Sequence, residues 1–140
     1  MTVQIATTRD IDACLALRRT VFIEEQQVPE ADEIDDLDED ALHILATDAG
    51  RPVGSARIIL LDDTAKIGRV CVLKDQRGTG LGAALIRAAL DAARDHAGVT
   101  RAKLGSQEYA IPFYEKLGFV AYGPVYLDAG IRHRDMELTL

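Results

Sequence analysis

The sequence has no tryptophan, only three phenylalanines and only two cysteines. At 140 residues the chain is long enough for a core without disulfide staples, so we expect Cys14 and Cys71 to be reduced, buried thiols. No apolar run approaches the roughly 20 residues that span a bilayer. The N-terminus also lacks the basic and apolar regions of a signal peptide. These absences predict a cytoplasmic protein that does not act at a membrane.

Positive charge is also scarce, and the net charge of −7 disfavours nucleic acid as a partner. Ten acidic residues fall within residues 24–40, which contain no Lys or Arg. Such a run is typical of a solvated loop, although it could also attract a cationic amine. Hydrophobic residues make up 48% of the chain, which fits one globular domain over residues 1–140.

Hydrophobic periodicity predicts alternating strands and helices. Strands are expected near residues 3–5, 41–48, 53–61, 67–73, 102–104, 119–122 and 131–140, and helices near 11–22, 81–97 and 109–117. Thr8 or Asp10 can cap the first helix, whose buried stripe would contain Ile11, Leu15 and Val21 or Phe22. The acidic segment after Pro29 should form at most one helical turn. The predicted order is β-α-β-β-β-α-β-α-β-β, an α/β sandwich with a mixed sheet.

The stretch over residues 67–97 joins an apolar, β-branched strand to an amphipathic helix through the connector KDQRGTGLG. The first turn of a helix leaves backbone N–H groups unpaired and carries partial positive charge. Glycines at 78, 80 and 82 remove side chains that would keep an anion from the backbone, and Arg77 adds a full charge. The connector therefore predicts a phosphate or pyrophosphate site.

The spacing of the glycines separates this connector from other phosphate loops. A Walker A loop ends in Lys-Ser or Lys-Thr, and a Rossmann loop has the pattern G-x-G-x-x-G early in the chain. Here the pattern is G-x-G-x-G behind an arginine. It resembles motif A of the GNAT superfamily of N-acetyltransferases, which grips the pyrophosphate of acetyl-coenzyme A. A different nucleotide-binding loop is the weaker alternative.

A second motif supports the resemblance. Residues 107–119, QEYAIPFYEKLGF, are similar to GNAT motif B, N-x-x-A-x-x-x-Y-E-x-x-G-F, with Gln107 where Asn is usual. The segments VFIEEQQVP, IGRVCVL and GIRHRDMEL resemble the small stand-alone bacterial branch described as ElaA-like or YjcF-like. The resemblance covers essentially the whole chain. It implies a GNAT-type mixed, mostly antiparallel sheet flanked by helices.

The resemblance implies an acetyl-CoA-dependent N-acetyltransferase that acts directly on a primary amine of a small molecule or peptide, and a fold that can form a homodimer. A non-catalytic acyl-CoA-binding or sensor module is the alternative. Tyr114 would protonate the leaving thiolate, because a phenol with a pKa near roughly 10 is protonated at pH 7. The implied cofactor-binding residues are Arg77, Gly78, Thr79, Gly80, Leu81, Gly82 and Ala83 for the pyrophosphate, the backbone of Val70, Cys71 and Val72 for the pantetheine arm, and Gln107 and Tyr114.

The general base departs from the family pattern. Many members carry a glutamate on the motif A strand, where this chain has only Lys66 and Arg69, and neither accepts a proton when charged. The candidates elsewhere are Glu25, at the end of the first helical region, His43 on the hairpin and His133 on the last strand pair. Water remains a further alternative.

Three residues are candidates for binding the substrate. Arg57 and Arg69 lie on neighbouring predicted strands and could bind a carboxylate or phosphate of the acceptor. A salt bridge between these arginines and the acidic segment is the alternative. Glu25 is the third candidate, because side chains from the first helical region reach the substrate site in the GNAT fold.

Overall fold

The computed structural model describes residues 3–140 and contains one seven-stranded sheet in the order β1-β2-β3-β4-β5-β7-β6. The strands are β1 Val3–Thr8, β2 Leu42–Asp48, β3 Arg51–Leu61, β4 Thr64–Val72, β5 Arg101–Gln107, β6 Val120–Asp128 and β7 Ile131–Thr139. The helices are α1 Ile11–Arg18, α2 Glu30–Glu33, α3 Leu81–Arg94 and α4 Ile111–Glu115. Only β4 and β5 pair in parallel, which confirms the predicted mixed, mostly antiparallel sheet. Within residues 3–140, no helix is long and apolar enough to cross a membrane.

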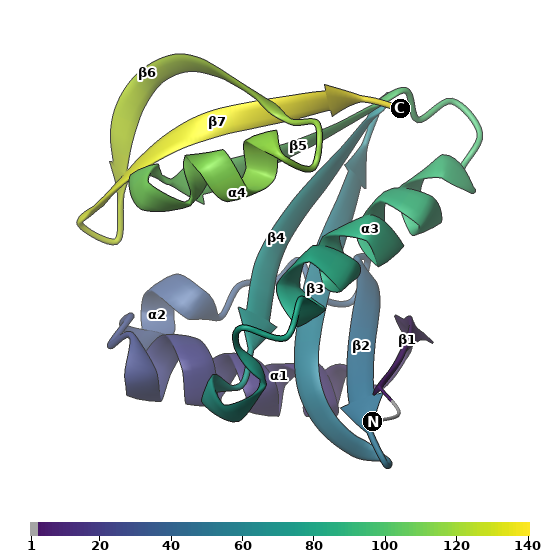
Figure 1. The fold of residues 1–140 in the computed structure, drawn as a ribbon, viewed down its shortest axis with the longest axis vertical. Coiled ribbons are helices and arrows are strands. Elements are labelled where there is room, and N and C mark those ends of the chain that lie inside the picture. The colour runs from purple at the N-terminus through teal and green to yellow at the C-terminus, as the bar shows by residue number, and fades with distance from the viewer. Residues whose placement is uncertain (1–2) are drawn as a thin grey trace.

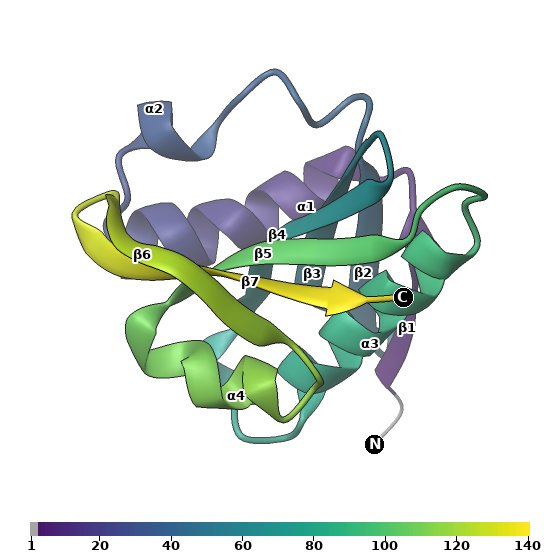
Figure 2. The same ribbon diagram turned by 90° about the horizontal axis from the view of Figure 1, so that it is seen from above.

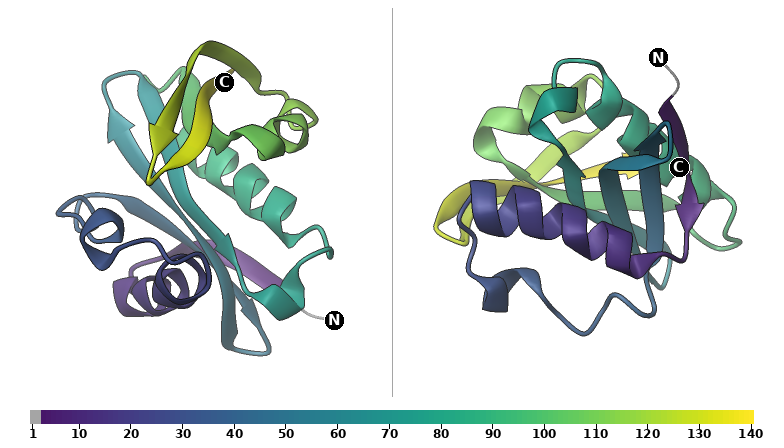
Figure 3. Two further views of the ribbon diagram at one scale, coloured as in Figure 1. Left: turned by 90° about the vertical axis from the view of Figure 1, so that its left-hand side faces the viewer. Right: turned by 90° about the horizontal axis from the view of Figure 1, so that it is seen from below.

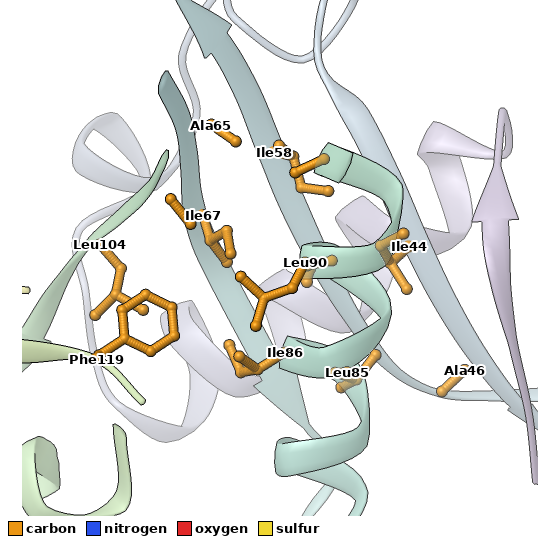
Figure 4. Close-up of a cluster of buried hydrophobic side chains, with 14 of the residues drawn as sticks. Ile44, Ala46, Ile58, Ala65, Ile67, Leu85, Ile86, Leu90, Leu104 and Phe119 are labelled. Atoms are coloured by element: carbon orange, nitrogen blue, oxygen red, sulfur yellow. The ribbon is translucent and has the colours of Figure 1, made fainter. Parts of the chain in front are cut away.

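Helices cover both faces of the sheet, with α3 and α4 on one face and α1 and α2 on the other (Figure 3). Helix α3 places Leu85, Ile86 and Leu90 at helical spacing against the sheet. These side chains meet Ile58 and Ile67 in the main core (Figure 4). Each such side chain contributes roughly 1.5–3 kcal/mol when it is removed from water. The core therefore fixes the position of α3, and with it the glycine-rich connector that precedes the helix.

Helix α1 begins at the Asp10 cap, whose carboxylate accepts a hydrogen bond from Ala13 N at 3.1 Å. It continues as a π-helical segment over Arg19–Glu25. Its buried residues are Cys14, Leu17, Arg18 and Val21, so the predicted stripe is confirmed at Val21, whereas Ile11 and Leu15 are only half-buried. An arginine, Arg18, takes part in the buried face instead.

The two cysteines are free and buried, as predicted. Cys14 lies on the buried face of α1, and Cys71 lies on β4, where its Sγ is 3.3 Å from Ser55 Oγ. Burial raises the pKa of the Cys14 thiol to about 11. Burial also raises the pKa of Cys71. Both side chains are therefore protonated and unreactive at neutral pH.

Strands β4 and β5 pair only where Thr64–Lys66 lies beside Arg101–Lys103. Beyond Lys66 the two strands separate (Figure 1). Arg69 has a left-handed backbone, with φ of 51°, at the point where the register between β3 and β4 shifts. In a regular strand Ile67 and Cys71 would lie on the same face, but here Ile67 joins the core under α3 and Cys71 packs with Leu17 of α1. The bulge between them therefore reverses the alternation of side chains.

The C-terminal half differs from the sequence prediction in its boundaries. Helix α4 is shorter than predicted, because a 3₁₀ turn at Glu108–Ala110 precedes it. Strand β5 is longer and extends to Gln107. The loop expected around Pro124 is part of β6, which has an irregular register between Tyr122 and Tyr126. A proline is tolerated there because β6 is an edge strand, where a missing backbone N–H breaks no ladder bond.

The acidic segment is not a simple solvated loop. Arg18 is only 1% exposed, and its guanidinium donates to both carboxylate oxygens of Glu33, at 2.8 and 3.1 Å, and to Asp38 at 2.7 Å. Burial alone would raise the pKa of Asp38, but hydrogen bonds from Arg18 and Arg57 outweigh it and hold the pKa below its usual value. The expectation of a solvated segment was therefore wrong for these acids, which are buried with their partners.

Two further arginines attach the same segment to the sheet. Arg57 donates to both oxygens of Asp35, at 2.8 and 3.0 Å, and Arg69 donates to Glu33 at 2.7 Å. The three arginines and the three acids Glu33, Asp35 and Asp38 are referred to below as the arginine cluster. The segment over residues 33–38 is thereby fixed across β3 and β4, above the helix α1 side of the sheet (Figure 2).

Replacing Arg18 with Met removes the guanidinium and keeps most of the side-chain volume. Glu33 and Asp38 then remain buried without their partner, so we expect the free energy of unfolding to fall by about 3–5 kcal/mol. Urea titration at pH 7 measures the change. The matched control is Arg19→Met, which removes an exposed guanidinium that pairs with Glu30 and should change stability little. Equal losses in the two variants would show that the arginine cluster does not hold the segment.

Candidate functional site

A cavity of about 480 Å³ opens where β4 and β5 separate. Lys66–Val70 of β4 line one side of it, and residues 103–105 and 107 of β5 line the other. The π-helical segment and α2 contribute Phe22, Gln26, Asp32 and Glu33, and the region from β6 to β7 contributes Tyr126, Asp128, His133 and Asp135. The cavity is therefore built where β4 and β5, which are neighbours in the sheet, no longer pair.

Tyr114 of α4 lines this cavity. Its ring packs edge-on against Phe113 and Phe119, with ring centroids 5.0 and 6.0 Å apart, and this packing fixes its orientation. Burial raises the pKa of Tyr114, so the hydroxyl carries its proton at neutral pH. Within residues 3–140, the one side-chain N or O that is sealed from solvent without a partner is Arg57 Nε, so the Tyr114 hydroxyl is not such an atom. The hydroxyl lines the cavity and can donate to a ligand there.

His133 of β7 also lines the cavity and is only 9% exposed. Its Nδ1 lies 2.7 Å from the Ile131 carbonyl, which can only accept a hydrogen bond. In the neutral ring Nδ1 therefore carries the proton and Nε2 presents a lone pair. The ring stacks on Tyr126, with centroids 5.9 Å apart. His133 is held in one orientation and has one nitrogen able to accept a proton.

The other two base candidates lie outside the cavity lining. The His43 Nε2 lies 2.8 Å from the Asp38 carbonyl, and the residue is buried beside the arginine cluster. Glu25 forms an ion pair with Arg77 at 2.6 Å, and this contact lowers its pKa. Neither side chain is placed to meet an acceptor in the cavity, so the expected role in proton transfer does not fit their positions.

The arginines proposed to bind substrate have other partners. Arg57 is buried against Asp35 and Asp38 and does not line the cavity. Arg69 lines the cavity, but its guanidinium donates to Glu33 and Asp35. The geometry therefore matches the alternative expectation, a salt bridge to the acidic segment. The signal in the sequence was the position of these arginines within otherwise apolar strands.

The glycine-rich connector has the shape that an anion site requires. Gly78 and Gly80 have φ values of 79° and 85°, and an added Cβ at either would meet nothing within 4 Å. The first backbone bond in this turn runs from Ala84 N to the Gly80 carbonyl, and within residues 3–140 no side chain caps the helix. The amides at the start of α3 are open, and the backbone geometry fits a pyrophosphate.

Arg77 is placed differently from the rest of the connector. Its Nε and Nη2 donate to the Val72 carbonyl at 3.2 and 3.1 Å, while Nη1 pairs with Glu25. The arginine thus ties the end of β4 to the first helical region. A pyrophosphate at the α3 amides would have to compete with Glu25 for this guanidinium.

The backbone of β4 offers an open edge beyond Lys66, because β5 no longer pairs with it there. Val70 and Val72 pack their side chains into the core, and Cys71 turns its side chain toward α1. Their backbone groups on the β5 side have no strand partner, which suits pairing with an extended ligand that contains amides. Gln107, at the far end of β5, lines the cavity.

Sequence analysis missed one wall of the cavity. Gly105, Tyr126 and Asp135 lie together on β5, β6 and β7, on the face that carries His133. Tyr126 fell in a stretch interpreted as a loop. The alternation from His133 to Asp135 along β7 was the available signal, because residues two apart in a strand share a face.

Comparisons with known proteins agree with this geometry. Residues 12–140 match the family model described as acetyltransferase (GNAT) domain. The chain is 40% identical over 121 residues to the uncharacterized N-acetyltransferase YjcF of Bacillus subtilis (strain 168), which covers 86% of each chain. The crystal structure of an acyl-CoA N-acyltransferase from Pseudomonas aeruginosa superposes with a TM-score of 0.89 at 31% identity, over 98% of this chain and 99% of that one. Escherichia coli ElaA superposes with a TM-score of 0.87 at 31% identity, again over 98% and 99% of the two chains. The separated strands, the two motifs and these matches lead to one conclusion, that the chain belongs to the GNAT family of acyl-CoA N-acyltransferases.

Proposed function

We propose that this protein transfers an acetyl group from acetyl-CoA to a primary amine by direct attack. The observation that supports this most strongly is the cavity between β4 and β5, where a protonated phenol and an imidazole with a free lone pair line the same space. Direct transfer needs one group that donates a proton and one that accepts a proton. Cys71 is sealed under α1 and is not required as a nucleophile.

The residues that would hold the cofactor are those whose backbone is open. The amides at the start of α3, from Leu81 to Ala83, would bind the pyrophosphate beside Gly78 and Gly80, with Thr79 between the two glycines. The backbone of β4 over residues 70–72 would pair with the pantetheine arm. When bound, acetyl-CoA supplies a thioester carbonyl for attack by the amine.

Tyr114 would then donate its proton to the departing thiolate. Its raised pKa keeps that proton in place at neutral pH, and its two aromatic neighbours keep the hydroxyl in one orientation. His133 would accept the proton that the amine nitrogen loses when it bonds to the carbonyl carbon, and return of that proton to the Tyr114 phenolate would restore both groups. Each proton thus has a defined origin and destination, and the products are an N-acetyl amine and free coenzyme A.

Two measurements on the purified protein test the proposal. Calorimetry should show heat on titration with coenzyme A, and a thiol-release assay with acetyl-CoA should give turnover on at least one member of a broad panel of primary amines. No heat of association at saturating coenzyme A would contradict the proposal outright. Heat without turnover on any amine would favour the non-catalytic binding module instead.

Tyr114→Phe should lower kcat by about 10²-fold or more, because a general acid typically contributes 10²–10⁴. The dissociation constant for coenzyme A should be unchanged, since the ring and its packing remain. Steady-state kinetics with the best amine of the panel, together with calorimetry, measure both quantities. Tyr109→Phe is the matched control, because it removes an exposed phenol from the rim of the same cavity. Normal turnover in Tyr114→Phe would remove this residue from the mechanism.

His133→Gln should also lower kcat by about 10²-fold, since an amide cannot accept the proton of the amine. Amines with a low pKa should be affected least, because the nitrogen of their tetrahedral adduct is the most acidic and loses its proton to water most readily. The control is His96→Gln, at an exposed position after α3. If turnover in His133→Gln matches that of the control across the amine series, water rather than His133 takes the proton.

A further inference from the structure

The wall of the cavity formed by β5, β7 and β6 contains a polar arrangement that the proposed transfer chemistry does not use. Gly105 pairs with Asp135, and Tyr126 pairs with His133, so these residues share one face of the sheet. The opposite face carries Leu104 and Met136, which are buried in the core. The shared face is therefore the one that is directed away from the core and into the cavity.

Tyr126 reaches across this face to Asp135. Its hydroxyl donates to Asp135 Oδ1 at 2.8 Å, and it lies so close to Gly105 that a Cβ there would be 2.4 Å from the phenol oxygen. Any side chain at position 105 would collide with this phenol. Burial and the neighbouring carboxylate raise the pKa of Tyr126, so the hydroxyl stays a donor. The absence of a side chain at Gly105 thus allows Tyr126 to fix the orientation of the Asp135 carboxylate.

The same wall already holds a primary ammonium group. The Lys103 Nζ lies 3.7 Å from Asp135 Oδ2 and 5.7 Å from the centroid of the Tyr122 ring. A carboxylate together with an aromatic face is a typical environment for an alkylammonium ion. Asp135 is about one-third exposed, and one hydrogen bond with one long ion contact leaves lone pairs free on the carboxylate.

We propose that Asp135 binds the ammonium form of the acceptor amine in the cavity, and that Tyr126, lying over Gly105, is the residue that positions this carboxylate. The inference rests on the proposed acetyl transfer and deepens it, because it names the group that selects a cationic acceptor. Asp135 captures the acceptor as its ammonium ion, and that ion releases one proton to solvent to give the free amine. His133, on the same face two residues along β7, takes the second proton during attack. Acceptors that are neutral when they arrive, such as alcohols, gain nothing from this contact.

Asp135→Asn tests the proposal, because asparagine keeps an acceptor for Tyr126 and loses only the charge. The KM for the best amine of the panel should rise about 10-fold or more, as expected for loss of a charge-assisted hydrogen bond. The dissociation constant for coenzyme A should not change. Tyr126→Phe should raise the same KM by a smaller factor, since the carboxylate remains but loses its orientation. The control Asp91→Asn removes an exposed charge on α3, away from the cavity lining.

A binding measurement gives a result whether or not any amine is turned over. In ¹H–¹⁵N NMR titrations, n-butylammonium chloride should shift the amide signals of Gly105 and Asp135, and n-butanol at equal concentration should not. The response should disappear in Asp135→Asn. Equal responses to both compounds, or an unchanged response in the variant, would overturn the role of Asp135 while leaving acetyl transfer intact. Loss of coenzyme A binding, by contrast, would overturn the proposed function itself.

Discussion

The structure depends on one constraint, that β4 and β5 pair for three residues and then separate. The core under α3 holds both strands from one side, through Ile67 on β4 and Leu104 on β5. Their side chains stay anchored while their backbones lose contact with each other. The gap is filled by neither strand, and the backbone groups along it remain available to a ligand. Tyr114, His133 and Asp135 line the cavity at this gap, and the amides at the start of α3 follow the end of β4 through the connector.

The arginine cluster determines the other side of the cavity. The segment over residues 24–40 has ten acidic residues and no basic ones, so without the arginines charge repulsion and hydration would keep it in solvent. Arg18, Arg57 and Arg69 come from α1, β3 and β4, and together they balance the charges of three carboxylates. Glu33 is thereby a wall of the cavity whose carboxylate oxygens are already bonded to two guanidinium groups.

The fold could largely be predicted from the sequence because its signals are local. The β-branched strand, the glycine connector and the amphipathic α3 follow one another within about thirty residues, and periodicity alone identifies them. Boundaries failed where tertiary context decided them. Pro124 suggested a loop, but β6 is an edge strand and tolerates a proline. Arg18 faces inward toward partners that lie 15 and 20 residues away in the chain, and local periodicity cannot reveal such partners.

The site was predictable only in part for the same reason. Tyr114 and His133 were found through a motif and through residue chemistry, and both line the cavity. His43 and Glu25 have equally suitable chemistry, yet their partners Asp38 and Arg77 engage them elsewhere. Asp135 went unnoticed because the alternation along β7 shows only that it shares a face with His133, whereas the contact of Tyr126 with Asp135 above Gly105 brings three strands together.

The attachment of the acidic segment also has a consequence for the order of folding. Its partners are 15 to 36 residues distant in the chain and lie on three different elements. We expect the segment to complete these contacts only after α1, β3 and β4 have assembled, and therefore late in folding. Interactions of this kind mainly slow unfolding. We therefore expect the arginine cluster to lengthen the lifetime of the native state more than it speeds folding.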